Sequence, residues 1–177
     1  MSTIFRLKFA FDDRNEEGKL KKAKLECLVE CETYSEAEKM AYDIIEREGL
    51  GTYGDVEYEI AKTKLSISNF IDNNTLSANR GMVNGKTECY FSDETDAFFI
   101  VKMKLYSYNE KGKKQQTLLT CVVSDESINK AIATVRAYMS STMQDYVITD
   151  TKMDVAEYLY LSPSSYKSIK ERYEAKA

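Results

Sequence analysis

The stretch Phe5-Arg6-Leu7-Lys8-Phe9 alternates apolar and basic side chains, and a related stretch, Phe99-Ile100-Val101-Lys102-Met103, stands 94 residues further along the chain. Further matches follow in the same order: Gly18-Lys19 with Gly112-Lys113, Leu25-Glu26-Cys27-Leu28-Val29 with Leu119-Thr120-Cys121-Val122-Val123, and Thr63-Lys64-Leu65 with Thr151-Lys152-Met153. The last pair has an offset of 88, because the second copy has a shorter connection after its helix. Collinear matches of this kind predict two copies of one structural unit.

Each copy is predicted to fold as β-β-α-β. In the first copy, the alternation over residues 5–9 and 23–31 is typical of two half-buried strands joined by a polar hairpin connection. Thr33 and Glu36 fit a capping box at the start of a helix, and a third strand is expected over residues 56–70. The elements expected in the second copy are strands near 98–108 and 115–123, a helix near 127–141 and a strand near 146–161.

Together these patterns predict an α+β protein made of two tandem, pseudo-symmetric β-β-α-β units, with each helix packed on one face of an antiparallel sheet. Ser162-Pro163 fits the start of a short C-terminal helix. The predicted organisation is a first unit at 1–71, a linker or long loop at 72–97, a second unit at 98–161 and the helix at 162–177. The sequence leaves open whether the units share one sheet.

Composition narrows the classes of function. Hydrophobic residues make up 43% of the 177, which is enough for a packed core. The formal net charge of -4 disfavours a general binder of duplex DNA. No apolar run is long enough to span a membrane, and Met1-Ser2-Thr3-Ile4-Phe5 lacks the features of a signal peptide. We therefore expect a protein that stays in the cytoplasm of whatever cell makes it, with no membrane partner.

The residues that common catalytic sites need are missing. The chain has no histidine, which excludes Ser-His-Asp and Cys-His catalysis and zinc sites that use histidine. Asp150-Thr151-Lys152 is similar to a fragment of metal-dependent nucleases, but no second acid is expected one strand away. The four cysteines form no C-x2-C pair and are expected to be free thiols: Cys27, Cys31, Cys89 and Cys121. We predict no catalytic residue, no metal site, no cofactor and no enzymatic activity.

Two stretches carry a family resemblance. Thr142-Met143-Gln144-Asp145-Tyr146-Val147-Ile148 and Thr63-Lys64-Leu65-Ser66, together with the order of the elements, resemble an uncharacterised two-repeat family that is described only as a domain of unknown function. The resemblance covers about residues 5–161 and implies a setting in Bacteroidota or their phages. It implies no activity, so no functional residue is carried over from it.

The face of each sheet turned away from its helix is the candidate ligand site. Alternation predicts that basic side chains share this face in the first unit: Arg6, Lys8, Lys22, Lys24, Lys62 and Lys64. The corresponding side chains of the second unit are Lys102, Lys104, Tyr106 and Tyr108. Lysine attracts phosphate, and an exposed aromatic ring stacks on a base. The alternative is a solvated sheet face, in which Glu26 and Glu30 dilute the charge and lysines protect the sheet from aggregation.

We therefore predict a non-catalytic accessory protein, encoded by a phage or a bacterium, that binds single-stranded nucleic acid or a signalling nucleotide on this face. The alternative function is a structural or assembly subunit that acts through protein–protein contacts. In that case the C-terminal helix would supply a homo-oligomer contact through one face formed by Tyr166, Ile169 and Tyr173.

Overall fold

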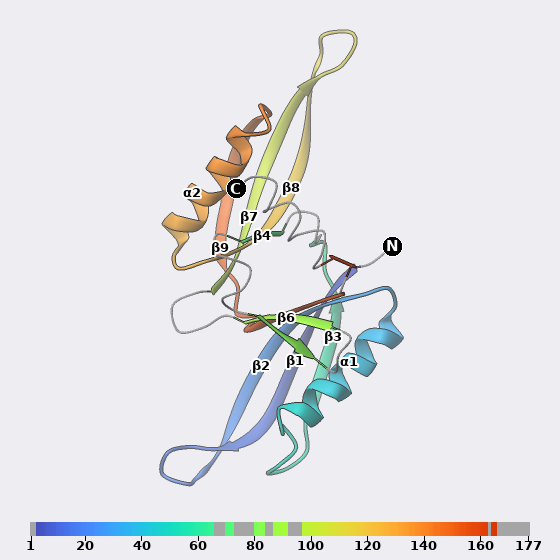
Figure 1. Cartoon of the computed structure of the whole chain (residues 1–177), viewed down its shortest axis with the longest axis vertical. Helices are drawn as coiled ribbons and strands as arrows, with labels where there is room; N and C mark the ends of the chain where they lie inside the picture. The colour runs from blue at the N-terminus through green and yellow to red at the C-terminus, as the bar shows by residue number, and fades with distance from the viewer. Residues whose placement is uncertain are drawn as a thin grey trace. The chain divides into compact units, whose positions relative to one another are not determined.

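In a computed structural model, the described residues are 3–65, 70–72, 80–83, 87–91, 97–162 and 164–165. Within them the fold is mixed α+β, with two helices and two sheets (Figure 1). The chain divides into two compact units, which are described separately below. The first comprises Met1–Lys64, Gly81–Phe91 and Ala156–Ser168, and the second comprises Leu65–Arg80, Ser92–Val155 and Ile169–Ala177.

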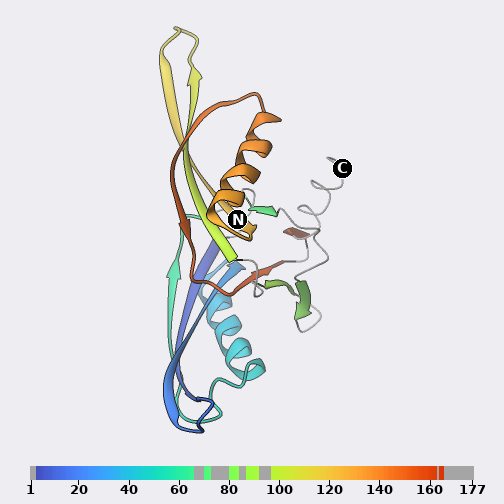
Figure 2. The same cartoon turned by 90° about the vertical axis from the view of Figure 1, so that its left-hand side faces the viewer.

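The first sheet has six strands in the order β3-β1-β2-β10-β6-β5. Their bounds are β1 (Thr3–Arg14), β2 (Leu20–Cys31), β3 (Glu57–Lys62), β5 (Arg80–Val83), β6 (Thr87–Phe91) and β10 (Tyr158–Leu161). Among the described residues, the helix α1 (Tyr34–Arg47) covers one face of β1, β2 and β3, and no helix covers the other face (Figure 2). Thr33 caps this helix by accepting a hydrogen bond from the N–H of Glu36 at 3.2 Å, as the capping box predicts.

Alternation along β1 and β2 builds the core of the first unit. Leu7 lies opposite Cys27 on β2 and opposite Ile60 on β3, so all three side chains face α1. The buried residues of this core are Phe5, Leu7, Phe9, Leu25, Cys27, Val29, Cys31, Ala37, Ala41, Ile44, Leu50 and Tyr160. Burial of about a dozen mostly apolar side chains between one helix and one sheet face is the main stabilising term of this unit.

The second sheet has four strands in the order β4-β8-β7-β9. Their bounds are β4 (Phe70–Asp72), β7 (Ala97–Tyr108), β8 (Lys114–Asp125) and β9 (Asp145–Met153), and the helix is α2 (Ile128–Ser140). The residues buried together beneath α2 are Phe99, Val101, Met103, Cys121, Val123, Ala131, Val135 and Met139. Ser127 caps α2 by accepting a hydrogen bond from the N–H of Lys130 at 3.2 Å.

Each sheet also receives a short parallel strand from a distant part of the chain. The predicted strand at 146–161 is wrong as a single element, because it divides into β9 and β10, which lie in different sheets. The N–H of Asp154 still donates to the Phe98 carbonyl at 2.7 Å, whereas the N–H of Glu157 donates to the Glu26 carbonyl of the first sheet at 2.9 Å. The chain therefore changes sheets between Asp154 and Glu157, and β10 pairs parallel to β2.

The first copy departs from prediction in the same region. The strand expected over 56–70 ends at Lys62, where the N–H of Thr63 donates to the Ile4 carbonyl at 3.0 Å. The next described residues, 70–72, form β4, which pairs parallel to β8 of the second sheet with Phe70 opposite Val122. Residues 72–97, expected as a linker or long loop, include the strands β5 and β6.

The chain end is described only in part. Ser162 accepts a hydrogen bond from the N–H of Ser165 at 3.2 Å, which is the bond expected of an N-cap. Tyr166, Ile169 and Tyr173 lie outside the described residues, so the predicted oligomer contact stays a prediction. No helix in the described part of the chain has both the length and the apolar character needed to cross a membrane.

Strand β10 stabilises the first unit although it follows the second helix in sequence. Tyr160 is fully buried, its hydroxyl accepts a hydrogen bond from Arg47, and the guanidinium carbon lies 5.0 Å from its ring centroid. We expect Tyr160→Ala to lower the free energy of unfolding of this unit by about 3 kcal/mol or more. Hydrogen exchange should accelerate in peptides of β1, β2 and α1 but not in those of β7 and α2.

Tyr34, which is 56% exposed, supplies the matched control for that experiment. Tyr34→Ala should change stability by roughly 0.5 kcal/mol or less. Faster exchange confined to the second unit in Tyr160→Ala would contradict the assignment of β10 to the first core.

Candidate functional site

The first open face is the side of the first sheet turned away from α1. Its exposed part consists of Arg6, Lys8, Ala10, Asp12, Lys22, Lys24, Glu26, Glu57 and Glu59. Four basic side chains on it meet four acidic ones. Lys8 lies opposite Glu26 on β2 and opposite Glu59 on β3, so a carboxylate flanks it on each side. The face is therefore close to neutral.

Most basic side chains of this face form ion pairs with acidic side chains of the same face. Glu26 lies 3.4 Å from the Arg6 guanidinium and 3.8 Å from the Lys8 ammonium, and Lys22 lies 3.0 Å from Asp12. A hollow of about 340 Å³ on this side has Glu26, Glu57 and Glu59 in its lining as well as lysines. A phosphate-bearing ligand would have to compete with these carboxylates, which weakens the site expected here.

Two predicted members of this face lie elsewhere. The expectation that Lys62 shares a face with Arg6 is wrong, because Lys62 pairs with Phe5, whose side chain faces α1. Lys64 lies beyond the end of β3. The side chains of Tyr58 and Ile60 on β3 face α1, so Lys62, two residues further along the strand, lies on that side as well and not on the open face. A shift of one residue in a strand moves every side chain to the opposite face.

The second open face is the side of the second sheet turned away from α2. Its members are Lys102, Lys104, Tyr106, Tyr108, Lys114, Gln116, Leu118, Thr120, Asp145, Val147, Asp150 and Lys152. The structure brings Lys102, Lys104, Tyr106 and Tyr108 together on it as predicted, since Val101 and Met103 between them are buried beneath α2. Four lysines on this face meet only two aspartates.

Rows across the sheet place apolar side chains beside the lysines. Lys104 lies between Leu118 on β8 and Val147 on β9, which are 72% and 50% exposed. The Lys114 ammonium lies 4.2 Å from the ring centroid of Tyr106. Tyr108 at the end of β7 is 66% exposed. The face therefore combines positive charge with accessible apolar and aromatic surface.

The lysines at the centre of this face are available to an external anion. In the part of the chain that the structure describes, no carboxylate forms an ion pair within 4.0 Å of Lys102 or Lys104. Asp150 is the register partner of Lys102 on β9, and Thr149 beside it forms a bulge that interrupts the pairing. The charge of Lys102 and Lys104 is thus less compensated than that of Lys8 and Lys22.

Sequence reasoning missed Lys114, Leu118 and Val147. The signal that could have found the β8 residues is the tight turn at Gly112, whose φ of 75° is the left-handed conformation that favours glycine. A backbone hydrogen bond joins Asn109 and Lys113 across this turn. Counting residues along both strands away from that pair gives the cross-strand pairs Tyr108–Lys114 and Lys104–Leu118. The β9 partner has no such local signal.

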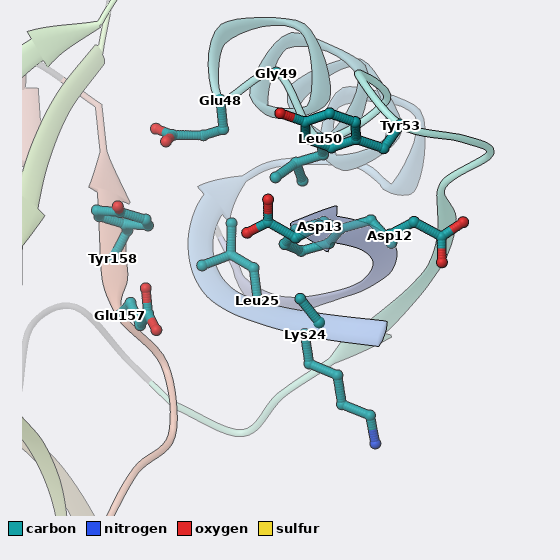
Figure 3. A pocket seen from close by; sticks show the side chains of 12 residues that line it. Asp12, Asp13, Lys24, Leu25, Glu48, Gly49, Leu50, Tyr53, Glu157 and Tyr158 are labelled. Carbon is teal, nitrogen blue, oxygen red and sulfur yellow. The ribbon is translucent and has the colours of Figure 1, made fainter. Parts of the chain in front are cut away.

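A second hollow of the first unit, of about 330 Å³, lies between the β1–β2 hairpin, the loop after α1 and the start of β10 (Figure 3). Leu25 and Leu50 give it an apolar wall, and Asp13, Glu48 and Glu157 line it as well. Lys24 directs its ammonium away from these side chains (Figure 3). The acidic side chains in its lining make this hollow unsuited to a phosphate.

The structure describes the side chains of three of the four cysteines, and all three are buried. Cys27, Cys31 and Cys121 are buried free thiols, as predicted. Burial raises the pKa of Cys121 to about 11, and burial followed by the charges of Glu36 and Glu30 raises that of Cys31 to about 12. Among the residues described, no group of three or more histidine, cysteine or acidic side chains is arranged to hold a metal ion. The Cys31 and Cys121 thiols are therefore protonated near neutral pH and weak nucleophiles.

The model of the family DUF4494, a domain of unknown function, matches residues 3–158. The chain belongs to this family. The DUF4494 match begins with β1 and ends at the first residue of β10, so it includes both helices and both open faces. A search of the curated proteins and a search of the solved structures returned no match. The resemblance to a domain of unknown function is confirmed, whereas the setting in Bacteroidota or their phages stays a prediction.

Burial of the Cys121 thiol makes stability depend on alkaline pH. Its pKa is raised above the usual value of 9.0 to about 11, so between these values the folded thiol stays protonated while the unfolded one ionises. The unfolded state then binds fewer protons, and stability falls as pH rises through this window. We expect the free energy of unfolding of Cys121→Ala to decline less between pH 9 and 10.5 than that of the unmodified chain.

Chemical denaturation at a series of pH values measures this difference. The substitution itself lowers the free energy of unfolding at every pH. The quantity to compare between the two chains is therefore the slope of the free energy of unfolding against pH, and not its absolute value. Parallel pH profiles for the two chains would contradict the assigned environment of Cys121.

Proposed function

We propose that this DUF4494 protein is a non-catalytic protein that binds a phosphate-bearing ligand through its second open face. The observation that carries the proposal is the row of Lys102 and Lys104, which have no carboxylate within ion-pair distance in the described part of the chain. Contacts between a phosphate and an ammonium group gain most when the ammonium is not already neutralised. The first open face, where Arg6, Lys8 and Lys22 are ion-paired, is the weaker candidate.

The distribution of charge along the chain supports the same choice. Residues 3–64 contain 11 lysines and arginines against 15 acidic residues, whereas residues 97–155 contain 8 against 6. With all its residues counted, the second unit has 12 basic and 12 acidic side chains and is neutral, so the net charge of -4 of the chain falls on the first unit. A polyanion therefore meets less repulsion at the second unit than at the first.

We also propose that the two units are pseudo-equivalent tandem copies. The supporting observation is local: Asn15 accepts hydrogen bonds from the N–H groups of Glu17 and Lys19, and Asn109 accepts them from Lys111 and Lys113. The strands that lead into these two turns share one burial pattern, residue by residue. In this proposal one copy kept an ion-paired face and the other became the binding face, in a protein of a bacterium or phage that acts in the cytoplasm.

Charge reversal at the second open face tests the ligand class. We expect Lys102→Glu combined with Lys104→Glu to weaken binding of long-chain inorganic polyphosphate by roughly tenfold or more, because two charge-assisted contacts are lost and two repulsions are gained. Isothermal titration calorimetry measures the affinity, and thermal unfolding checks that the fold is retained.

Lys8→Glu combined with Lys24→Glu is the matched control, because it makes the same change in charge on the first open face. Its binding should fall by less than threefold. An equal loss of affinity in both double variants would show that net charge alone, and not the second open face, controls binding.

A second candidate function, assembly through protein–protein contacts, is favoured by exposed apolar side chains along and beside the edge strand β9. Met143, Met153 and Val155 are 94%, 55% and 67% exposed. Met143 also has a φ of 57°, a conformation that side chains other than glycine seldom adopt. Exposed apolar surface beside a strand edge is typical of a contact with another chain.

Met153→Lys combined with Val155→Lys tests this alternative. If β9 and its flanks form an oligomer contact, sedimentation velocity should show an oligomer for the unmodified chain and a smaller species for the double variant. A monomer at all concentrations for the unmodified chain would remove the assembly function.

A further inference from the structure

We infer that the ligand of the second open face is single-stranded nucleic acid several nucleotides long, held by its bases as well as by its phosphates. This inference rests on the proposed function, because it takes for granted that the face binds phosphate. It goes further by assigning a role to the apolar residues Leu118, Val147 and Tyr108, which a ligand consisting of phosphate alone would leave unused.

The dimensions of the face favour a polymer. From Lys102 to Tyr108 the strand advances six residues, which corresponds to roughly 20 Å at the rise of an antiparallel strand. Both ends of this span are exposed. Small ligands such as mononucleotides are usually held in a concave site that buries most of their surface. An exposed strip of this length instead offers successive contacts to several nucleotides.

The chemistry of the strip alternates in a way that suits bases and phosphates in turn. Lys104 is flanked across the sheet by Leu118 and Val147, and the next residue on the same side of β7 is Tyr106. Residues two apart on one strand face are separated by roughly 7 Å. A base lying on an aromatic or apolar side chain therefore has an ammonium group within reach of the phosphate beside it.

The two aspartates restrict the path of the phosphates. Asp145 and Asp150 both lie on β9, whereas Lys102 and Lys104 lie on β7 and Lys114 lies on β8. Because Lys152 also lies on β9, this strand contributes a net charge of -1 to the face, against +2 from β7 and +1 from β8, so phosphates are favoured over β7 and β8. We place the phosphates on the lysines of β7 and β8, with bases lying on Tyr108 and Leu118 between them. A base that lies on Val147 has beside it the Asp145 carboxylate, which accepts hydrogen bonds from exocyclic amino groups.

A duplex does not use these features. In double-stranded DNA the bases are stacked on each other and show only their edges, so Tyr108 and Leu118 would gain no stacking partner. The remaining interaction would be with phosphates alone, against an overall charge of -4. Covering Leu118, which is 72% exposed, with the face of an unpaired base removes apolar surface from water.

Fluorescence anisotropy with the full chain tests the inference. The probes are a labelled 15-nucleotide DNA strand without self-complementarity, the RNA strand of the same sequence, the corresponding DNA duplex, and ATP as a competitor. We expect either single strand to bind at least tenfold tighter than the duplex, the affinity to rise between 4 and 12 nucleotides, and ATP to compete only at far higher concentration.

Removal of the apolar contacts separates base stacking from charge. Tyr108→Ala and Leu118→Ala should each weaken single-strand binding by roughly fivefold or more, since stacking on one side chain contributes that much or more per base. Neither variant should change the affinity for inorganic polyphosphate. Leu20→Ala is the matched control, because Leu20 is an exposed leucine, at 59%, on the hairpin of the first unit.

The outcomes distinguish the two levels of the proposal. If polyphosphate, duplex and single strand bind equally and Tyr108→Ala and Leu118→Ala bind like the unmodified chain, the inference is overturned while the phosphate-binding function stands. If ATP competes as well as the oligonucleotide, the ligand is a mononucleotide and the inference is again overturned. If no phosphate-bearing probe binds, the proposed function falls together with the inference.

Discussion

The pairing register of the two long hairpins is the constraint on which the rest of the structure depends. In each hairpin the side-chain oxygen of an asparagine, Asn15 or Asn109, accepts hydrogen bonds from two backbone N–H groups. A glycine in each turn, Gly18 or Gly112, adopts a positive φ. Turns of this kind allow one register only. A slip of one residue would turn the lysines of β7 towards α2 and expose Val101 and Met103, so the core and the open face are specified by the same turn.

The same register explains why the two open faces differ in charge. Lys8 on β1 lies opposite Glu26 on β2, whereas Lys102 on β7 lies opposite Thr120 on β8. Lys102 therefore has a neutral partner on β8 and meets a carboxylate only on β9, where Asp150 is its register partner, whereas Lys8 meets carboxylates on both neighbouring strands. The difference in charge between the two open faces thus arises from pairs of residues on neighbouring strands and not from the number of lysines.

Short strands from remote parts of the chain complete each sheet. Strand β10 brings Leu159, Tyr160 and Leu161, all fully buried, to the side of β2 in the first unit. A parallel neighbour needs a long connection, and here that connection contains the whole β7–β8–α2–β9 segment. The stability of the first unit therefore depends on residues near the end of the chain, and truncation there removes part of a core that is formed by the chain's beginning.

Local sequence patterns were sufficient for the alternating strands, the cap at Thr33 and the shared face of Lys102, Lys104, Tyr106 and Tyr108, because each depends on residues a few positions apart. Three features were decided by pairing between distant residues. These are the break between β9 and β10, the position of Lys62 on the side of the sheet that faces α1, and the placement of Glu26 and Glu59 on either side of Lys8. No periodicity within one strand encodes its neighbour. Cross-strand partners are set by the packing of a whole sheet, where charge is either compensated or left available to a ligand.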